Sequence, residues 1–303
     1  MLYLTYNNTA HMDGFGSQLQ RMLSVYCVAK EMGAAYIHSG FHDIQYQGLK
    51  CLEENKTDDE FVATANRLFK MEGVDAVPSF DEVVLVDYLT RDVLDKWLSA
   101  AACKTILLRI TYAHRLLDAE PEIFRHAPAF PWVSPSPRVS ASPRVSPSTQ
   151  PIQIAVHIRR GELFLVDSDR MLPNEYYYEV MKQLHQMFSK SNQSYQFTIY
   201  TEQPTKRTEV SPQHPGIWNR FEANKVISPE QTDLSIFMNI PNTRFKINTD
   251  PFETFIEMVN SDILVCSLSS FSYTAALLKK EGHVLIPKKR FWHGSMAHWL
   301  DTV

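Results

Sequence analysis

The second half of the chain alternates continuous apolar runs with amphipathic stretches, and this alternation limits the fold more than any other feature. Short apolar runs bounded by polar residues are typical of buried strands, and apolar residues at helical spacing are typical of helices that cover them. Buried strands joined by helices predict a parallel sheet. The predicted strands are IQIAVHI (152–158), YQFTIYTE (195–202), the weaker KVISP (225–229), DILVCS (262–267) and, last, HVLIPK (283–288); the predicted helices are 174–188, 250–261 and 270–282.

The helix ends of this half carry capping residues. Asn174 follows a proline and is predicted to be an N-cap, and Asp250 before Pro251 is predicted to be another. The first half has the same organisation with weaker signals. A strand at 2–6 precedes a helix that ends at Gly33, a predicted C-cap. Further strands are predicted in AAYIHS (34–39), DEVVLVDYL (81–89) and KTILLRITY (104–112).

A chain of 303 residues is long enough for two domains, each with its own core. Residues 131–151, PWVSPSPRVSASPRVSPSTQP, form one low-complexity segment that is too rich in proline and serine to pack. We therefore predict an N-terminal domain over 1–130, a linker or mobile loop over 131–151 and a C-terminal domain over 152–303. The predicted fold class is α/β.

Composition excludes several classes of protein. The net charge is −4, and no basic stripe indicates a nucleic-acid partner. No apolar run reaches the roughly 18 residues of a membrane span, and the start of the sequence lacks the basic leader of a signal peptide. The four cysteines are scattered, which is typical of reduced thiols. These observations predict a cytoplasmic protein.

Three loops follow predicted strands, and in parallel sheets ligands bind at the carboxyl ends of strands. The first contains Gly14 and Gly16, where a backbone can approach a ligand closely. The second contains Arg159, whose planar guanidinium matches phosphate oxygens. The third contains Ser269 and Ser270, at the start of a helix whose free N–H groups favour an anion. Together the loops predict a site for a diphosphate.

These loops carry a resemblance to a known superfamily. VHIRRGEL resembles the HxRRGD signature of the inverting fucosyltransferases, which include α-1,2-, α-1,6- and protein O-fucosyltransferases. MDGFGSQLQRMLSVYCVAKEMGAAYIHSGF is similar to the N-terminal glycine-rich loop and helix of that superfamily, and SDILVCSLSSFSYTAALL is similar to its third motif. The three matches occur in the family's order and cover about half of the chain.

The resemblance implies the GT-B architecture, in which two Rossmann-like domains with parallel sheets face a cleft. The N-terminal domain would lie on the acceptor side, and the C-terminal domain would bind the nucleotide-sugar. It implies a glycosyltransferase with a nucleotide-sugar donor, most simply GDP-fucose, a glycan acceptor, no metal and no further cofactor. Arg159 would bind the β-phosphate and stabilise the leaving nucleotide. The remaining implied donor-site residues are His157, Arg160, Asp262, which would read the base, Ser269, Ser270 and Phe271, with Gly14 and Gly16 from the other domain.

An inverting displacement needs a base to accept the proton of the acceptor hydroxyl. Three carboxylates compete for this role: Asp167, ten residues after His157, then Glu162, beside the arginines, and Asp13, in the first loop. Asp167 has the spacing of the base proposed for the α-1,6 branch and is the favoured candidate. Glu162 could instead serve as the counter-charge of the arginines.

Other readings stay open at this stage. Asp167 and Asp169 form a DxD pair like that of metal-dependent GT-A enzymes, which hold Mn²⁺ or Mg²⁺ against a diphosphate. The fold could also accept a UDP-sugar such as UDP-xylose. A nucleotide- or glycan-binding protein without catalysis is the non-enzymatic alternative.

Overall fold

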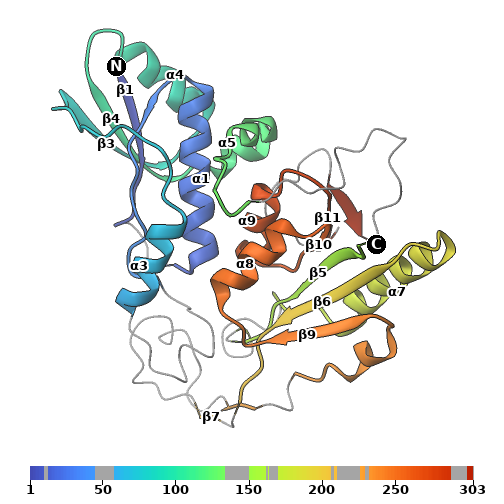
Figure 1. Ribbon diagram of the computed structural model, residues 1–303. Helices are drawn as coiled ribbons and strands as arrows, with labels where there is room; N and C mark the ends of the chain where they lie inside the picture. Colours follow the sequence, from blue (N-terminus) through green and yellow to red (C-terminus); the bar gives the residue numbers. More distant parts are fainter. Residues whose placement is uncertain are drawn as a thin grey trace. The chain divides into compact units, whose positions relative to one another are not determined.

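The computed structural model describes residues 1–9, 13–44, 58–133, 150–161, 163, 170–205, 208–209, 226–228, 232–287 and 299–302. These residues form two compact units, which divide between residues 131 and 132 (Figure 1). Each unit contains a parallel sheet covered by helices. The predicted fold class, α/β with two Rossmann-like units, is confirmed.

The first unit contains a four-stranded sheet in the order β2-β1-β4-β3, with every pair parallel. β1 (Leu2–Tyr6) is buried along its whole length and lies between β2 (Ala35–Tyr36) and β4 (Ile106–Tyr112), while β3 (Glu82–Tyr88) forms one edge. The chain adds β2 on one side of β1, then β3 and β4 on the other, with β4 inserted between β1 and β3. The gap between β1 and β4 is therefore the topological switch point of this sheet.

Helix α1 (Phe15–Glu31) packs against this sheet with most of its side chains buried. The chain turns away from the helix at Gly33, whose φ of +63° is the left-handed conformation that glycine adopts without strain. Ala34 N donates to Ala29 O at 2.9 Å, which completes a Schellman motif and confirms the predicted C-cap. The other helices of the unit are α3 (Asp58–Leu68), α4 (Arg91–Ala100), α5 (His114–Ala119) and the 3₁₀ helix η1 (Pro121–His126).

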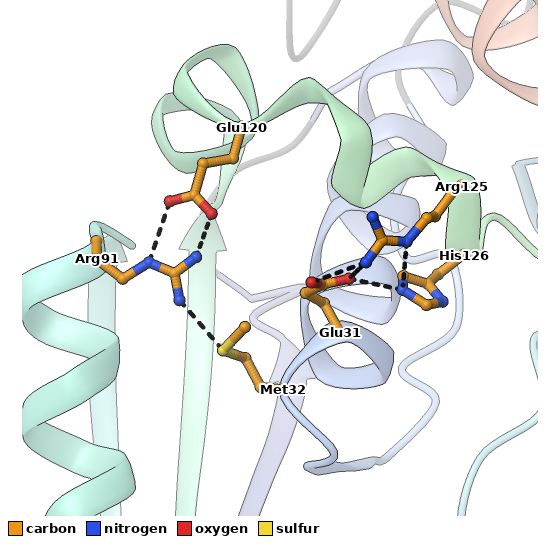
Figure 2. Close-up of polar contacts among 6 residues, drawn as sticks. All are labelled: Glu31, Met32, Arg91, Glu120, Arg125 and His126. Atoms are coloured by element: carbon orange, nitrogen blue, oxygen red, sulfur yellow. Dashed lines mark hydrogen bonds and ion pairs between the residues drawn. The ribbon is translucent and has the colours of Figure 1, made fainter.

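A polar network fastens these helices to one another, as Figure 2 shows. Glu31 at the end of α1 accepts from Arg125 at 2.7 Å and lies 2.7 Å from His126 Nε2, both on η1. Arg91, at the start of α4, binds both carboxylate oxygens of Glu120. The charged groups in this network are paired with one another, so we assign it a structural role.

The second unit contains a six-stranded sheet in the order β12-β11-β10-β5-β6-β9, again entirely parallel. The chain runs from β5 to β6 and β9 on one side, then returns to place β10, β11 and β12 on the other. The switch point therefore lies between β5 and β10. The strands are β5 (Ile152–Ile158), β6 (Tyr195–Thr201), β9 (Thr243–Ile247), β10 (Ile263–Val265), β11 (His283–Pro287) and β12 (Leu300–Thr302).

Helices cover both faces of this sheet (Figure 1). α7 (Asn174–Lys190) buries Tyr177 and Met181 against alternate residues of β5, β6 and β10. α8 (Pro251–Asn260) and α9 (Ser270–Leu278) pack together and lie on the opposite face. The short 3₁₀ helix η5 (Ser235–Asn239) adds Phe237 to the core on the α7 side.

The capping predictions had different outcomes. Asp250 accepts hydrogen bonds from Phe252 N and Glu253 N at 2.9 and 3.0 Å, so it caps α8 as predicted. The prediction for Asn174 is wrong, because this residue is already helical and its side chain makes no cap bond. Its amide contacts Arg160 and Asp233 instead.

Two strand predictions are also corrected. KVISP contributes only β8 (Val226–Ile227), which pairs antiparallel with β7 (Thr208–Glu209) and lies outside the main sheet. HVLIPK corresponds to β11 but is not the last strand, because β12 follows and extends the sheet by one. Within the described residues, none of the helices is both long enough and apolar enough to cross a membrane.

Candidate functional site

The strongest candidate site lies in the second unit, where the carboxyl ends of β5 and β10 diverge. In open α/β sheets this switch point is where ligands bind, because the loops leave in opposite directions and open a crevice. The loop after β5 carries His157 at the strand end, then Arg159, Arg160 and Gly161; the loop after β10 carries Ser267 and leads into α9.

A hydrogen bond between His157 and Ser267 joins the two loops. His157 Nδ1 and Ser267 Oγ are 2.9 Å apart, and both side chains are buried. The imidazole also packs against Phe271 on α9, with ring centroids 5.5 Å apart. Burial, together with the charges of Arg159 and Arg160, lowers the pKa of His157 to about 3. The histidine is therefore neutral at physiological pH and serves as a polar wall, not as a cation.

The two adjacent arginines have different surroundings. Arg160 is 6% exposed, and its guanidinium donates to Arg159 O at 2.9 Å and to Asn174 Oδ1 at 2.5 Å. It holds the loop and the start of α7 in place. The Arg159 side chain is 21% exposed, and it pairs with Glu202 at 3.4 Å. Of the two cations, Arg159 is the one that a ligand can reach.

Gly161 shapes the loop that carries these arginines. Its φ of +67° lies in the left-handed region that a residue with a Cβ rarely adopts. A Cβ at this position would also meet the carboxylate of Glu202. The glycine therefore lets the chain turn sharply after Arg160 while Glu202 stays beside Arg159.

The start of α9 offers backbone donors to the same crevice. Ser269 is the N-cap, and its Oγ accepts from Phe271 N at 3.3 Å. Ser272 Oγ accepts from Ser267 N at 3.3 Å, which fixes the turn between strand and helix. Ser270 is the first helical residue. A helix start in this position favours an anion through its free N–H groups and its dipole.

The structure brings together most of the predicted donor-site residues on the second unit: His157, Arg159, Arg160, Ser269, Ser270 and Phe271. Asp262 is not among them. It precedes β10 at the amino edge of the sheet, where its carboxylate accepts from Gln153 N at 2.7 Å. This position is four residues, or about 13 Å, from the level of His157. We therefore leave the base-reading role out of the site.

Two residues at the crevice were not predicted. Glu202 follows β6 and is a counter-charge of Arg159; the signal was its place at the end of a predicted strand. Tyr177 is fully buried near Arg160 and Ser267, and its hydroxyl has no hydrogen-bond partner of good geometry among the described residues. No sequence pattern marks Tyr177, because it is one of three consecutive tyrosines on a helix.

The predicted residues of the first loop lie in the first unit. Gly14 is the N-cap of α1, and Gly16 lies in its first turn. Asp13 is held on both oxygens, since Oδ1 accepts from Gly14 N at 2.9 Å and Oδ2 binds Arg21 at 2.5 Å. Gln18 Nε2 donates to Asp13 O and His42 O, and thereby fixes the loop.

Several predictions fall on residues outside the described part of the chain. These are the base candidates Glu162 and Asp167, the pair formed by Asp167 and Asp169, and residues 134–149 of the predicted linker. Within the described residues, no group of three or more His, Cys, Asp or Glu is arranged to hold a metal ion. The metal-dependent alternative, which rests on Asp167 and Asp169, is therefore untested.

No family model matches the chain, and no curated protein matches it in sequence. Among solved structures, E. coli heptosyltransferase WaaC with ADP-2-deoxy-2-fluoro heptose is similar over 100% of this chain and 93% of its own, with 10% identity and a TM-score of 0.39. The same enzyme with ADP is similar over 99% and 92%, with 9% identity and a TM-score of 0.39. At these values the likeness supports no functional argument, and the assignment of the fold depends on the sheets described above.

Proposed function

We propose that this protein is an inverting, metal-independent glycosyltransferase that transfers a sugar, most simply L-fucose from GDP-fucose, to a glycan hydroxyl. The observation that carries the proposal is the meeting of a reachable arginine and an open helix start at the β5–β10 switch point. Arg159 and the N–H groups of α9 are donors of the kind that bind a diphosphate. The likeness of VHIRRGEL to the fucosyltransferase signature supports the same assignment.

In the proposed reaction, the acceptor oxygen bonds to the anomeric carbon while the bond from that carbon to the diphosphate oxygen breaks. Negative charge develops on the leaving diphosphate, and Arg159 and the α9 start stabilise it. Burial keeps His157 neutral, so it does not act as a cation toward the diphosphate. It holds the two loops together through its hydrogen bond to Ser267. The Arg160 guanidinium donates a hydrogen bond to the carbonyl oxygen of Arg159 and thereby positions that residue.

The proton of the acceptor hydroxyl passes to a carboxylate. Both oxygens of Asp13 are already engaged by Arg21 and Gly14, which makes it the weakest of the three candidates. Glu162 and Asp167 remain the proposed bases, with Asp167 preferred for its spacing from His157.

Calorimetric titration with GDP and with UDP in the presence of EDTA tests this proposal. We expect GDP to bind the wild type, and Arg159→Ala to weaken binding about 10- to 100-fold, because a charge-assisted hydrogen bond to phosphate is lost. Arg109→Ala is the matched control, since Arg109 is an exposed arginine on β4 of the first unit. Its affinity for GDP should equal that of the wild type.

The other outcomes separate the alternatives. Preference for UDP would keep the mechanism and change the donor, with UDP-xylose tested first. Binding that requires Mn²⁺ would overturn the metal-free assignment and favour Asp167 and Asp169. Binding of GDP and UDP without transfer to any acceptor would favour the non-catalytic alternative.

A further inference from the structure

The first unit has a second cluster of polar and aromatic side chains at its own switch point, between β1 and β4. The carboxyl ends of the two strands are tied together, since Asn7 N donates to Ile110 O at 2.9 Å and Asn7 Nδ2 donates to Thr111 Oγ1 at 3.3 Å. Tyr6 and Tyr112 are the last residues of β1 and β4. This position is the one at which an open parallel sheet places a ligand.

Two tyrosine rings and two guanidinium groups form a continuous stack there. Arg21 Cζ lies 4.6 Å from the centroid of Tyr112, whose ring stacks on Tyr88 with centroids 5.1 Å apart and an angle of 18°. Arg115 Cζ lies 4.3 Å from the centroid of Tyr88. Tyr88 is 44% exposed and Arg115 is exposed, so this end of the stack is open to solvent.

The cluster is rich in hydrogen-bond donors and poor in acceptors. Arg21 Nη1 and the Tyr6 hydroxyl are buried and lie close to one another, and neither makes a hydrogen bond of good geometry with any described residue. Arg115 makes no ion pair with any residue that the structure describes. Two carboxylates lie nearby: Asp13 has both oxygens occupied, and Asp118 acts on His114, which packs against the tyrosines. Buried donors without acceptors are costly, and such donors mark places where a ligand oxygen would be favourable.

We propose that this cluster binds the acceptor, and that the acceptor is a saccharide carrying a carboxylate or phosphate group. The anionic group would bind the guanidinium groups, which present fork-shaped N–H edges to planar or tetrahedral anions. The sugar ring would lie against the exposed tyrosine. In calling the ligand an acceptor, this inference rests on the proposed function; the site itself does not.

Binding of three saccharides to the full chain tests the inference: digalacturonate as the carboxylate probe, glucose 6-phosphate as the phosphate probe and cellobiose as the neutral one. We expect at least one anionic probe to bind about tenfold more tightly than cellobiose, and the tighter of the two identifies the anionic group. Tyr88→Ala and Arg115→Ala should each weaken that binding about tenfold.

Lys96→Ala is the matched control, because Lys96 Nζ also lies over an aromatic ring, that of Trp97, at 5.0 Å on helix α4. Lys96→Ala should change the affinity for the anionic probe less than twofold. All three variants should bind GDP as the wild type does. Equal affinity for cellobiose, no binding of any probe, or unchanged binding in Arg115→Ala would overturn the inference. If the anionic probe binds and depends on Arg115 but neither GDP nor UDP binds, the site stands and the proposed function falls.

Discussion

The β5–β10 crevice of the second unit and the β1–β4 cluster of the first occupy the same topological position but hold their arginines differently. Arg159 lies 3.4 Å from Glu202, a long pair that leaves its guanidinium partly exposed. Arg21 lies 2.5 Å from Asp13 and packs on Tyr112. A partly exposed cation beside a helix start suits a diphosphate, because the diphosphate supplies the opposite charge. A fixed cation in an aromatic stack suits a ligand with a ring.

The difference also concerns histidine. His157, near the end of β5, is buried by Ser267 after β10 and by Phe271 on α9, and it lines the crevice in its neutral form. His114 lies beside the tyrosine stack, and burial lowers its pKa in the same direction, though it is less enclosed. In the second unit the neutral histidine is therefore part of the proposed anion site, whereas in the first unit the histidine lies beside an open aromatic surface.

The largest expected effect is a pH dependence of stability in the second unit. The pKa of His157 is lowered to about 3, so between pH 3 and 6.5 the unfolded chain binds a proton that the folded chain does not. The stabilisation is complete above pH 6.5 and is lost as the pH falls toward 3. Between pH 6.5 and 4 this residue should account for about 3 kcal/mol of the free energy of unfolding.

Urea unfolding at a series of pH values measures this contribution of His157 to the free energy of unfolding. His157→Gln removes the titrating group and keeps an amide that can bond to Ser267. The wild type should lose more stability than His157→Gln as the pH falls. Parallel curves for the two proteins would mean that His157 is not buried in a neutral form.

A smaller effect tests whether Arg159 exchanges its partner. Glu202→Gln removes the counter-charge that a diphosphate must displace, so GDP affinity should rise about fivefold. Calorimetry at low and at physiological salt measures the change, which should shrink at high salt. Glu253→Gln, a change of one exposed carboxylate on α8, is the control. Weaker binding in Glu202→Gln would indicate that Glu202 itself contacts the nucleotide.

The smallest effect compares one N-cap from each unit. Ser269 caps α9 and Thr90 caps α4, with hydrogen bonds of 3.3 and 3.4 Å. Replacing either residue by alanine should lower the free energy of unfolding by about 1 kcal/mol. Only Ser269→Ala should also weaken GDP binding, because only the start of α9 lies in the crevice. Equal GDP affinity in both variants would remove the α9 start from the site.

Much of the fold was predictable because the second unit is built from continuous apolar strands. β5, β6, β10 and β11 lie where the apolar runs indicate them. β9 was missed because its sequence, TRFKI, is too short and has too few apolar residues to stand out as an apolar run, and it is only half-buried. Helices α3 and α4 of the first unit were missed because they bury few residues each.

The candidate site was predictable only in part. Its loops could be predicted from the ends of the strands. The position of Asp262 at the opposite edge of the sheet was also predictable, because this residue precedes its strand. The side chains that pair with the two arginines could not be predicted from the sequence. Arg160 meets Asn174, and Arg159 meets Glu202, 43 residues away, because β6 lies next to β5 in the sheet.

Hydrogen exchange with and without GDP is the most direct test of whether the β5–β10 switch point is the nucleotide site. We expect slower exchange in GDP at Arg159–Gly161 and at Ser269–Phe271, with no change at the ends of β1 and β4. Protection at the ends of β1 and β4 alone, or no protection at Arg159 and the start of α9 under saturating GDP, would contradict it.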